Sequence, residues 1–138
     1  MRQQLVETAL AWEKIFSIAP AITSTVAEYD AARLIGLDEN TYSSLMQDTT
    51  AVQKGFDFKA YGVRYQVKGN RPSGKPGSRV TKVPKASNYD WDTLIWILYD
   101  KNYKIEEAWL WSVDDYKAAF DGIKRLSPQH YRQGIKLQ

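Results

Sequence analysis

The segment from Phe56 to Lys68 reads FDFKAYGVRYQVK and brings an acid, an amide and an amine together on neighbouring stretches of chain. Alternating residues on either side of a Tyr-Gly pair predict a β-hairpin, because glycine can adopt the positive φ that a two-residue turn needs. Pairing across this turn places Asp57 opposite Gln66, and Lys68 follows two residues later on the same face. The three polar groups would lie roughly 5 to 7 Å apart. Such a group could hold a divalent cation beside a phosphate.

The same alternation divides the hairpin into two faces. The apolar face is predicted to carry Phe56, Phe58, Val63, Tyr65 and Val67, and the polar face Asp57, Lys59, Arg64, Gln66 and Lys68. A shared cation site requires that the polar side chains converge.

The composition indicates a single globular domain over residues 1–138, with 43% hydrophobic and 25% charged residues. No apolar run is long enough to span a membrane, and the first residues lack the layout of a signal peptide. A cytoplasmic protein without a membrane partner is therefore expected. The absence of cysteine excludes disulfides, thiol nucleophiles and zinc ribbons, and the single histidine excludes a multi-histidine metal site.

Positive charge is concentrated in residues 54–85. This stretch contains nine Lys or Arg residues and one acid, Asp57, so it carries +8, whereas the whole chain carries +3 and the remainder therefore −5. Such a block favours a polyanionic partner, because basic side chains neutralise phosphates and release counterions. A solvated basic loop is the alternative. The position of the only acid of the block on the polar face of the hairpin favours the nucleic-acid interpretation.

The N-terminal third is predicted to be mainly helical. Apolar periodicity indicates a helix over residues 2–18, and a second helix is expected from about Ser24 to Ile35. Ser24 or Thr25 would open the second helix, and Gly36 would close it. Residues 38–53 are polar and are interpreted as a loop with one helical turn.

The C-terminal half is predicted to contain two further strands and a helix. A long Gly-, Pro- and Ser-rich surface loop follows the hairpin at 55–69. An apolar strand over 93–99, a strand over 104–111 and a helix over 113–124 capped by Ser112 come next. The predicted fold class is α/β, with a small mixed four-stranded sheet flanked by helices.

Three segments, STVAEYDAARLIGL, KGFDFKAYGVRYQVKG and YDWDTLIWILYD, together resemble the PD-(D/E)xK nuclease superfamily. They are similar to the branch of archaeal Holliday-junction resolvases and small restriction-type endonucleases. Its members have a helix with a glutamate, a strand with an aspartate, a strand ending in (E/D/Q)xK and an apolar strand. The resemblance covers roughly residues 24–100. It implies a restriction endonuclease-like sandwich that hydrolyses DNA phosphodiester bonds with Mg²⁺ or Mn²⁺.

The resemblance also implies a role for individual residues. Asp57 would be the central metal ligand, since Mg²⁺ prefers carboxylate oxygens. Gln66 would replace the usual acid with an uncharged amide oxygen, and the Val67 carbonyl would add a ligand. Lys68 would orient or activate the attacking water, or stabilise charge on the phosphate.

Glu28 has two interpretations. It matches the helix glutamate of the superfamily, which completes the metal site or holds a water. Thr25 and Glu28 also have the spacing of a capping box, in which the carboxylate binds a backbone amide. The sequence leaves both open.

Seven basic residues are predicted to contact the nucleic-acid backbone. They are Lys59, Arg64, Arg71, Lys75, Arg79, Lys82 and Lys85. The expected partner is duplex or branched DNA, and cutting a duplex would use two active sites, as in a homodimer. The tryptophans and tyrosines of the later strands are interpreted as core or dimer-surface residues in preference to a base-stacking surface.

Two other functions remain open. One is a catalytically inactive nucleic-acid-binding module of the same fold, which the uncharged Gln66 favours. The other is a protein-interaction domain whose aromatic strands mediate assembly.

Overall fold

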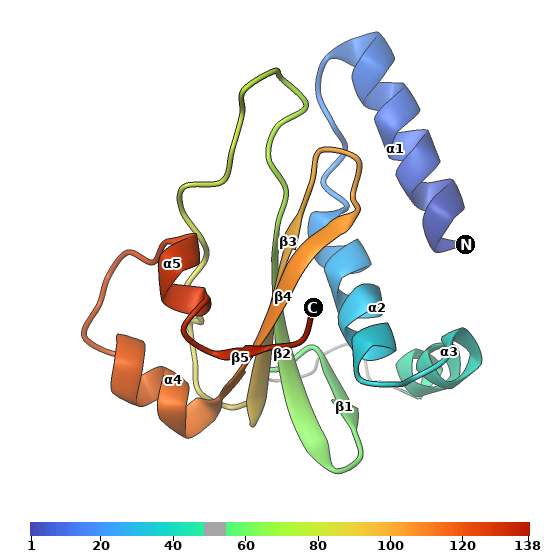
Figure 1. The fold of residues 1–138 in the computed structure, drawn as a ribbon. Coiled ribbons are helices and arrows are strands. Elements are labelled where there is room, and N and C mark those ends of the chain that lie inside the picture. Colours follow the sequence, from blue (N-terminus) through green and yellow to red (C-terminus); the bar gives the residue numbers. More distant parts are fainter. Residues whose placement is uncertain (49–54) are drawn as a thin grey trace.

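The computed structural model describes residues 1–48 and 55–138, and Lys54 of the predicted basic block lies outside them. One mixed sheet runs in the order β1-β2-β3-β4-β5 (Figure 1). Its strands are β1 (Phe58–Ala60), β2 (Val63–Asn70), β3 (Thr93–Tyr99), β4 (Ile105–Ser112) and β5 (Ile135–Lys136). β2 and β3 are parallel, and the other neighbouring pairs are antiparallel. The sheet has one strand more than predicted, because the C-terminal tail adds β5 at its edge.

β3 is the central strand, and every residue from Leu94 to Tyr99 is buried. Ile95 and Ile97 pack on one face with residues of the N-terminal helices. Leu94 and Trp96 pack on the other face with the C-terminal helices. The predicted strand over 93–99 is confirmed, and its continuous apolar character follows from this double cover.

The large aromatic side chains belong mainly to the interior, as predicted. Trp91 and Trp96 have no exposed surface, and Tyr99 and Tyr103 are each 1% exposed. They fill the space on the two sides of the sheet and are not available for stacking on bases.

Three helices form the N-terminal third, namely α1 (Arg2–Phe16), α2 (Thr23–Leu34) and α3 (Glu39–Gln47). α1 ends where Ser17 adopts a φ of 67°. The predicted side-chain cap of α2 is wrong, because Ile22 occupies the N-cap position and no side chain caps the helix. Gly36 closes the end of α2 with a φ of 97°, as predicted.

α3 lies in the segment over 38–53 that was predicted to be a loop with one helical turn, and residues 49–53 of this segment lie outside the described residues. The Asp38 side chain caps it by accepting a hydrogen bond from the Thr41 backbone N–H at 2.7 Å. Tyr42, Leu45 and Met46 pack against the core beside α2. The loop prediction was wrong because this helix is mostly polar and depends on tertiary packing for its stability.

The C-terminal helices cover the other face of the sheet (Figure 1). α4 (Val113–Phe120) begins at Ser112, whose hydroxyl oxygen accepts the Asp115 backbone N–H at 3.2 Å, as predicted. It ends at Phe120, before the predicted position 124. α5 (Pro128–Tyr131) is a single turn. Residues 71–92 connect β2 to β3 as an irregular segment. It begins beside the end of α1 and then passes to the side of α4 and α5, where Val83 and Trp91 are buried.

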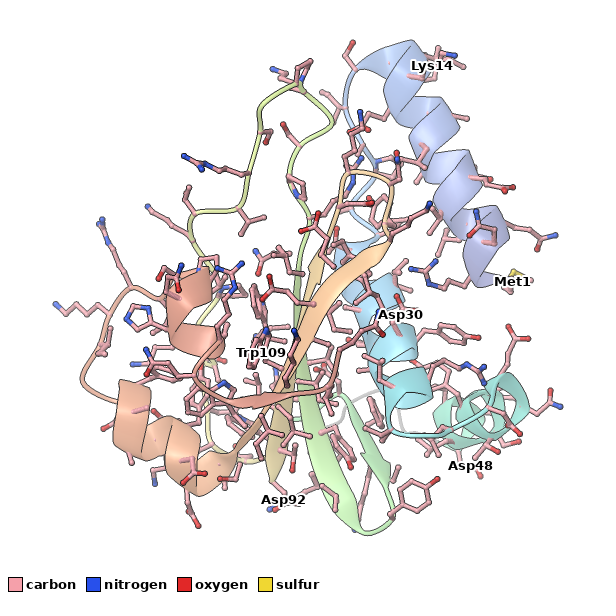
Figure 2. The ribbon with its side chains drawn as sticks, viewed as in Figure 1. Met1, Lys14, Asp30, Asp48, Asp92 and Trp109 are labelled. Carbon is pink, nitrogen blue, oxygen red and sulfur yellow. The ribbon has the colours of Figure 1, made fainter. Side chains whose placement is uncertain are left out.

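A buried ion pair fixes the position of α2. Asp30 of α2 is 5% exposed, and its carboxylate accepts hydrogen bonds from Arg2 at 2.6 and 2.8 Å and from the Tyr99 hydroxyl at 2.6 Å. Figure 2 labels Asp30 on α2 and Met1 at the start of α1. A buried carboxylate is costly unless it is paired, so these contacts hold α1, α2 and β3 in one arrangement.

No helix among the described residues combines the length and the apolar character that crossing a bilayer requires.

Candidate active site

The predicted hairpin is formed. Its register is as predicted from Phe58 onward, but the ladder does not include the predicted pair of Asp57 and Gln66. Lys59 pairs with Arg64, and Phe58 pairs with Tyr65. The two turn residues, Tyr61 and Gly62, have φ values of 55° and 74°. Positive φ at both positions is typical of the tight turn that joins two twisted antiparallel strands.

The side chain of Asp57 ends the pairing between β1 and β2. The Asp57 backbone N–H still donates to the Tyr65 carbonyl at 2.8 Å, and its Oδ2 accepts the Val67 backbone N–H at 2.7 Å. Backbone N–H groups of a strand point along the plane of the sheet. The Asp57 carboxylate therefore lies in this plane beyond the end of β1, and not on the polar face where alternation had placed it.

The alternation fails at Asp57 because the chain bends there. Phe56 consequently packs with the C-terminal cluster, whereas Phe58 packs with the N-terminal helices. The prediction that these two phenylalanines share one face is wrong. The same bend turns the Asp57 side chain toward the gap that β1 leaves beside β2.

Glu28 of α2 reaches this gap from the helical side. In its protonated form Glu28 donates a hydrogen bond to the Asp57 carboxylate. The alternative capping-box role of Glu28 is not found, since α2 has no side-chain cap. Two of the predicted site residues, which lie far apart in the sequence, are thus brought together at the end of the hairpin.

The surroundings of this acid pair disfavour two negative charges. Burial, followed by the charge of Asp57 and the hydrogen bond to it, raises the pKa of Glu28 to about 7. Tyr42 of α3 lies beside the pair, and burial together with the charges of Glu28 and Asp57 raises the pKa of its hydroxyl to about 12. Close carboxylates cannot both ionise without a cost, which a bound cation would offset.

Sequence analysis missed Tyr42 because its segment was interpreted as a loop. The helical spacing of Tyr42, Leu45 and Met46 was the available signal. Tyr42 also packs edge-on against Phe58, with ring centroids 6.2 Å apart and an angle of 86° between the planes. α3 thereby covers the acid pair from the helical side.

Gln66 and Lys68 lie on the other face of β2. They pair in register with Leu94 and Trp96 of β3, which belong to the C-terminal cluster. Tyr65 and Val67, which alternate with them along the strand, face the N-terminal helices. Gln66 and Lys68 therefore share a face with each other, as predicted, but Glu28 approaches the sheet from the opposite side.

Both side chains are free to bind a ligand. Gln66 and Lys68 are half-buried, and within residues 1–48 and 55–138 neither side chain has a hydrogen-bond or ion-pair partner. The Val67 backbone joins the two parts, because it lies between Gln66 and Lys68 while its N–H binds Asp57. Because the Asp57 carboxylate lies in the plane of the sheet, it stands between Glu28 on one face and Gln66 and Lys68 on the other.

The residues present fit a hard divalent cation in donor type. Glu28 and Asp57 supply carboxylates, Gln66 an amide oxygen and Val67 a backbone carbonyl, which are ligands of the kind that Mg²⁺ and Mn²⁺ accept. The raised pKa of Glu28 reports the unfavourable negative charge that a cation would balance. In the described part of the chain no three His, Cys, Asp or Glu side chains cluster as metal ligands. A cation here would depend on two acids and uncharged oxygens.

Arg64 is held by an acid of the chain itself. Its guanidinium donates to Asp92 at 3.0 and 3.1 Å, and its backbone N–H donates to the same carboxylate at 2.9 Å. These bonds lower the pKa of Asp92 to about 2. Figure 2 labels Asp92, which precedes β3 and thereby ties it to the start of β2.

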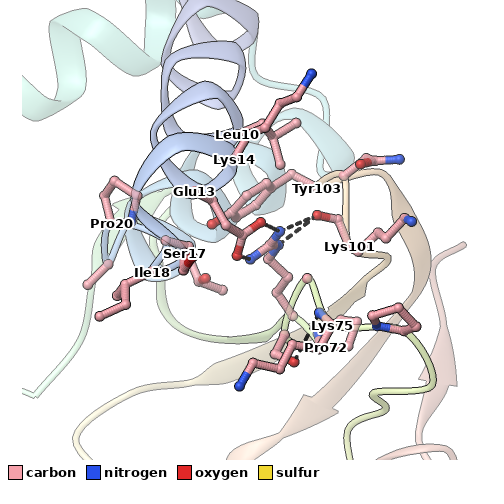
Figure 3. A pocket seen from close by; sticks show the side chains of 18 residues that line it. Leu10, Glu13, Lys14, Ser17, Ile18, Pro20, Pro72, Lys75, Lys101 and Tyr103 are labelled. Atoms are coloured by element: carbon pink, nitrogen blue, oxygen red, sulfur yellow. Dashed lines mark hydrogen bonds and ion pairs between the residues drawn. The ribbon is translucent and has the colours of Figure 1, made fainter.

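Arg71 is held even more closely, at the edge of a pocket of about 950 Å³ between the end of α1 and the start of the long loop (Figure 3). Its guanidinium donates to Glu13 at 2.8 and 3.1 Å and to the Lys101 carbonyl, and it lies 4.5 Å from the centre of the Tyr103 ring. Its side chain is 6% exposed. Arg71 therefore joins α1 to the sheet, and its predicted contact with DNA is not available in this arrangement.

The other predicted basic contacts divide into two groups. Lys85 donates to the backbone carbonyls of Asp121 and Ile123 at 3.0 and 2.9 Å. Lys59, Lys75, Arg79 and Lys82 are exposed, and their side chains have no hydrogen bond or ion pair with any described residue. Four of the seven predicted residues thus present a free cation to solvent.

Comparison with known proteins does not identify a family for this chain. No protein-family model matches the chain, and no curated protein sequence is similar to it.

Proposed function

We propose that this protein is a metal-dependent endonuclease that hydrolyses phosphodiester bonds of DNA. The observation that carries the proposal is the meeting of Glu28 and Asp57 at the end of a hairpin whose second strand continues as Gln66-Val67-Lys68. Acid pairs of this kind suit a cation that binds phosphate. The exposed cations of the neighbouring loop suit the DNA backbone.

The proposal gives each residue a specific task. Asp57 and Glu28 would bind the cation, with the Gln66 amide and the Val67 carbonyl as uncharged ligands. When bound, the cation would polarise a phosphoryl oxygen and lower the pKa of a water. Lys68, whose ammonium has no partner among the described residues, would orient that water or stabilise charge developing on the phosphate.

The raised pKa of Glu28 belongs to the metal-free protein. A bound cation would favour the charged carboxylate and lower this pKa, so Glu28 would act as a metal ligand and not as a general base. Tyr42 would limit access of solvent from the helical side.

The proposal is tested by incubating supercoiled plasmid, linear duplex and a branched junction with the protein and Mg²⁺ or Mn²⁺, with EDTA as the blank. We expect nicking that EDTA abolishes. Asp57→Asn should lower the rate by at least about 100-fold and Lys68→Ala by about 10²–10⁴-fold. Lys104→Ala, which removes an exposed cation beside the β3–β4 turn, should cut at the wild-type rate. Equal cutting by wild type and Asp57→Asn would reject the proposal.

The second candidate is a nucleic-acid-binding module that does not cut. It is favoured by the neutral Gln66 in place of an acid and by the limit of two carboxylates in the described site. Salt-dependent DNA binding with no nicking in either metal would select this candidate.

Cutting both strands of a duplex calls for two such sites, so the proposal includes a two-fold homodimer on duplex DNA. Light scattering of the protein with and without a duplex would test it. A monomer that only nicks would instead limit the enzyme to single-strand cleavage.

A further inference from the structure

Two basic segments that are far apart in the sequence are joined on the face of the sheet that carries Lys68. Val83 of the long loop and Leu126 of the α4–α5 connection form an antiparallel bridge, in which the Val83 N–H donates to the Leu126 carbonyl at 3.1 Å. The Tyr131 hydroxyl donates to the Pro84 carbonyl at 2.6 Å. These bonds hold the loop against the C-terminal helices.

The bridge turns basic side chains outward. Val83 and Leu126 are 7% and 3% exposed and belong to the core. Side chains alternate about such a pairing, so their neighbours Lys82 and Arg125 point away from the core. Both are exposed, and so is Lys124. We call Lys82, Lys124 and Arg125 the basic ridge.

The charges of the ridge are not neutralised by neighbours in the described chain. No carboxylate lies within ion-pair distance of its three side chains, whereas Arg64 and Arg71 are each paired with an acid. The nearby acid Asp121 is engaged by the Tyr89 hydroxyl at 2.7 Å. The ridge is therefore a concentration of free positive charge.

The ridge begins next to the candidate site. The Asn70 side-chain amide of β2 donates to the Lys82 carbonyl at 3.5 Å, and its oxygen accepts the Trp96 indole N–H at 2.9 Å. Asn70 follows Gln66 and Lys68 along β2 with its side chain on the same face. Lys82 thus lies on the face of the sheet to which the Lys68 ammonium belongs.

We propose that the basic ridge binds the phosphodiester backbone of DNA and extends the substrate path from Lys68 across the α4–α5 connection. The inference rests on the proposed function for the direction of this path, but the ridge itself is assigned from its geometry and charge. Lys124 and Arg125 lie outside the basic block that the sequence shows, so only the bridge between Val83 and Leu126 reveals them as part of the same surface.

Fluorescence anisotropy with a labelled duplex of about 20 base pairs tests the ridge, in EDTA so that no cutting occurs. Affinity is measured over about 50 to 300 mM salt for the wild type, Lys124→Ala/Arg125→Ala and Lys82→Ala. Each lost phosphate contact lowers the slope of log K against log salt by about 0.9. The double variant should therefore lose about 1.8 in slope and bind about 10- to 100-fold more weakly at 0.1 M salt.

A variant with the same loss of charge elsewhere is the control. Lys14→Ala/Lys104→Ala removes two exposed cations from α1 and the β3–β4 turn, and it should bind like the wild type. Equal behaviour of the ridge and control variants would overturn the proposal, because net charge alone would then explain binding. Lys124→Gln/Arg125→Gln removes the charges but keeps flexible polar side chains, so it repeats the test if the alanine variant folds poorly.

Cutting assays on the same variants separate this inference from the proposed function. If the wild type does not cut but ridge variants lose salt-dependent binding, the ridge stands and the nuclease proposal fails. If the wild type cuts and ridge variants bind like the control, the nuclease proposal stands and the ridge is wrong. Absence of salt-dependent binding in the wild type rejects the ridge directly.

Discussion

The carboxyl groups of Glu28 and Asp57 meet, although one belongs to a helix and the other to the end of a β-hairpin. Asp57 reaches this position because its chain bends and its Oδ2 binds the Val67 N–H in the plane of the sheet. Glu28 reaches it because α2 packs on that sheet through Val26, Ala27 and Ala31. A costly pair of acids is thus held in place by two independent parts of the fold.

The acid pair predicts stabilisation by a divalent cation. Mn²⁺ or Mg²⁺ at about 100 times its dissociation constant should add about 2.7 kcal/mol to the free energy of unfolding, which is a rise of about 10 °C in Tm. Asp57→Asn should abolish this rise, whereas Glu106→Gln, which alters an exposed acid on β4, should keep it. Thermal unfolding with metal and with EDTA measures the effect. An equal rise in Asp57→Asn would place the cation elsewhere.

The raised pKa of Glu28 predicts a pH-dependent stability. The pKa of its carboxyl rises from the ordinary value of 4.5, which applies to the unfolded chain, to about 7 in the folded protein, so the folded state binds the proton more tightly. Without metal, the free energy of unfolding should therefore fall by about 1–2 kcal/mol, after discount for partial exposure, as pH rises from about 4.5 to about 7. Above about pH 7 this loss is complete. Glu28→Gln should remove this fall, as urea unfolding at several pH values would show.

In the same variant, activity and stability should change in opposite directions. Glu28→Gln should be more stable than the wild type at about pH 8 and should cut DNA at least about 100-fold more slowly. A variant that is less stable than the wild type at this pH would indicate that the carboxylate pair is not repulsive.

α2 approaches β2 so closely at Gly69 that no larger residue fits there. A Cβ at Gly69 would lie 2.7 Å from the Cβ of Ala27 and 3.6 Å from Cγ2 of Thr23. Gly69→Ala should therefore cost about 1–3 kcal/mol in the free energy of unfolding, because the core has no room for a methyl group. Adding Ala27→Gly should recover part of the loss despite its own cost of about 1 kcal/mol in the helix. Strictly additive losses in the double variant would contradict the close contact.

Arg71 and Lys82 belong to the same basic block, but we expect Arg71 to contribute to stability and Lys82 to contribute to DNA binding. Arg71→Ala should lower the free energy of unfolding by about 3 kcal/mol, because it leaves Glu13 and the Lys101 carbonyl without their donor. It should leave the salt dependence of DNA binding unchanged. Lys82→Ala should reduce the slope of that dependence by about 0.9 and leave stability within about 0.5 kcal/mol of the wild type. Denaturation and fluorescence anisotropy on both variants measure the two effects. A loss of DNA binding in Arg71→Ala, or a loss of stability in Lys82→Ala, would contradict this prediction.

Local pattern in the amino-acid sequence was enough to predict several parts of the fold. The hairpin register followed from the alternation around Tyr61 and Gly62, and β3 followed from a continuous apolar run. The Ser112 cap and the closing Gly36 also follow from short-range backbone chemistry. Such features need only neighbouring residues, so a single sequence suffices to predict them.

The convergence of these parts depends on tertiary packing. Alternation placed Asp57 on the polar face, but a bend and the Val67 N–H moved its carboxylate into the plane of the sheet. The packing of α2 on the sheet places Glu28 beside Asp57 and not in a capping box. Arg64 and Arg71 form ion pairs with acids of the chain, so they are not free cations. Each outcome depends on contacts between distant segments, whose energies exceed local preferences and leave no mark in the spacing of nearby residues.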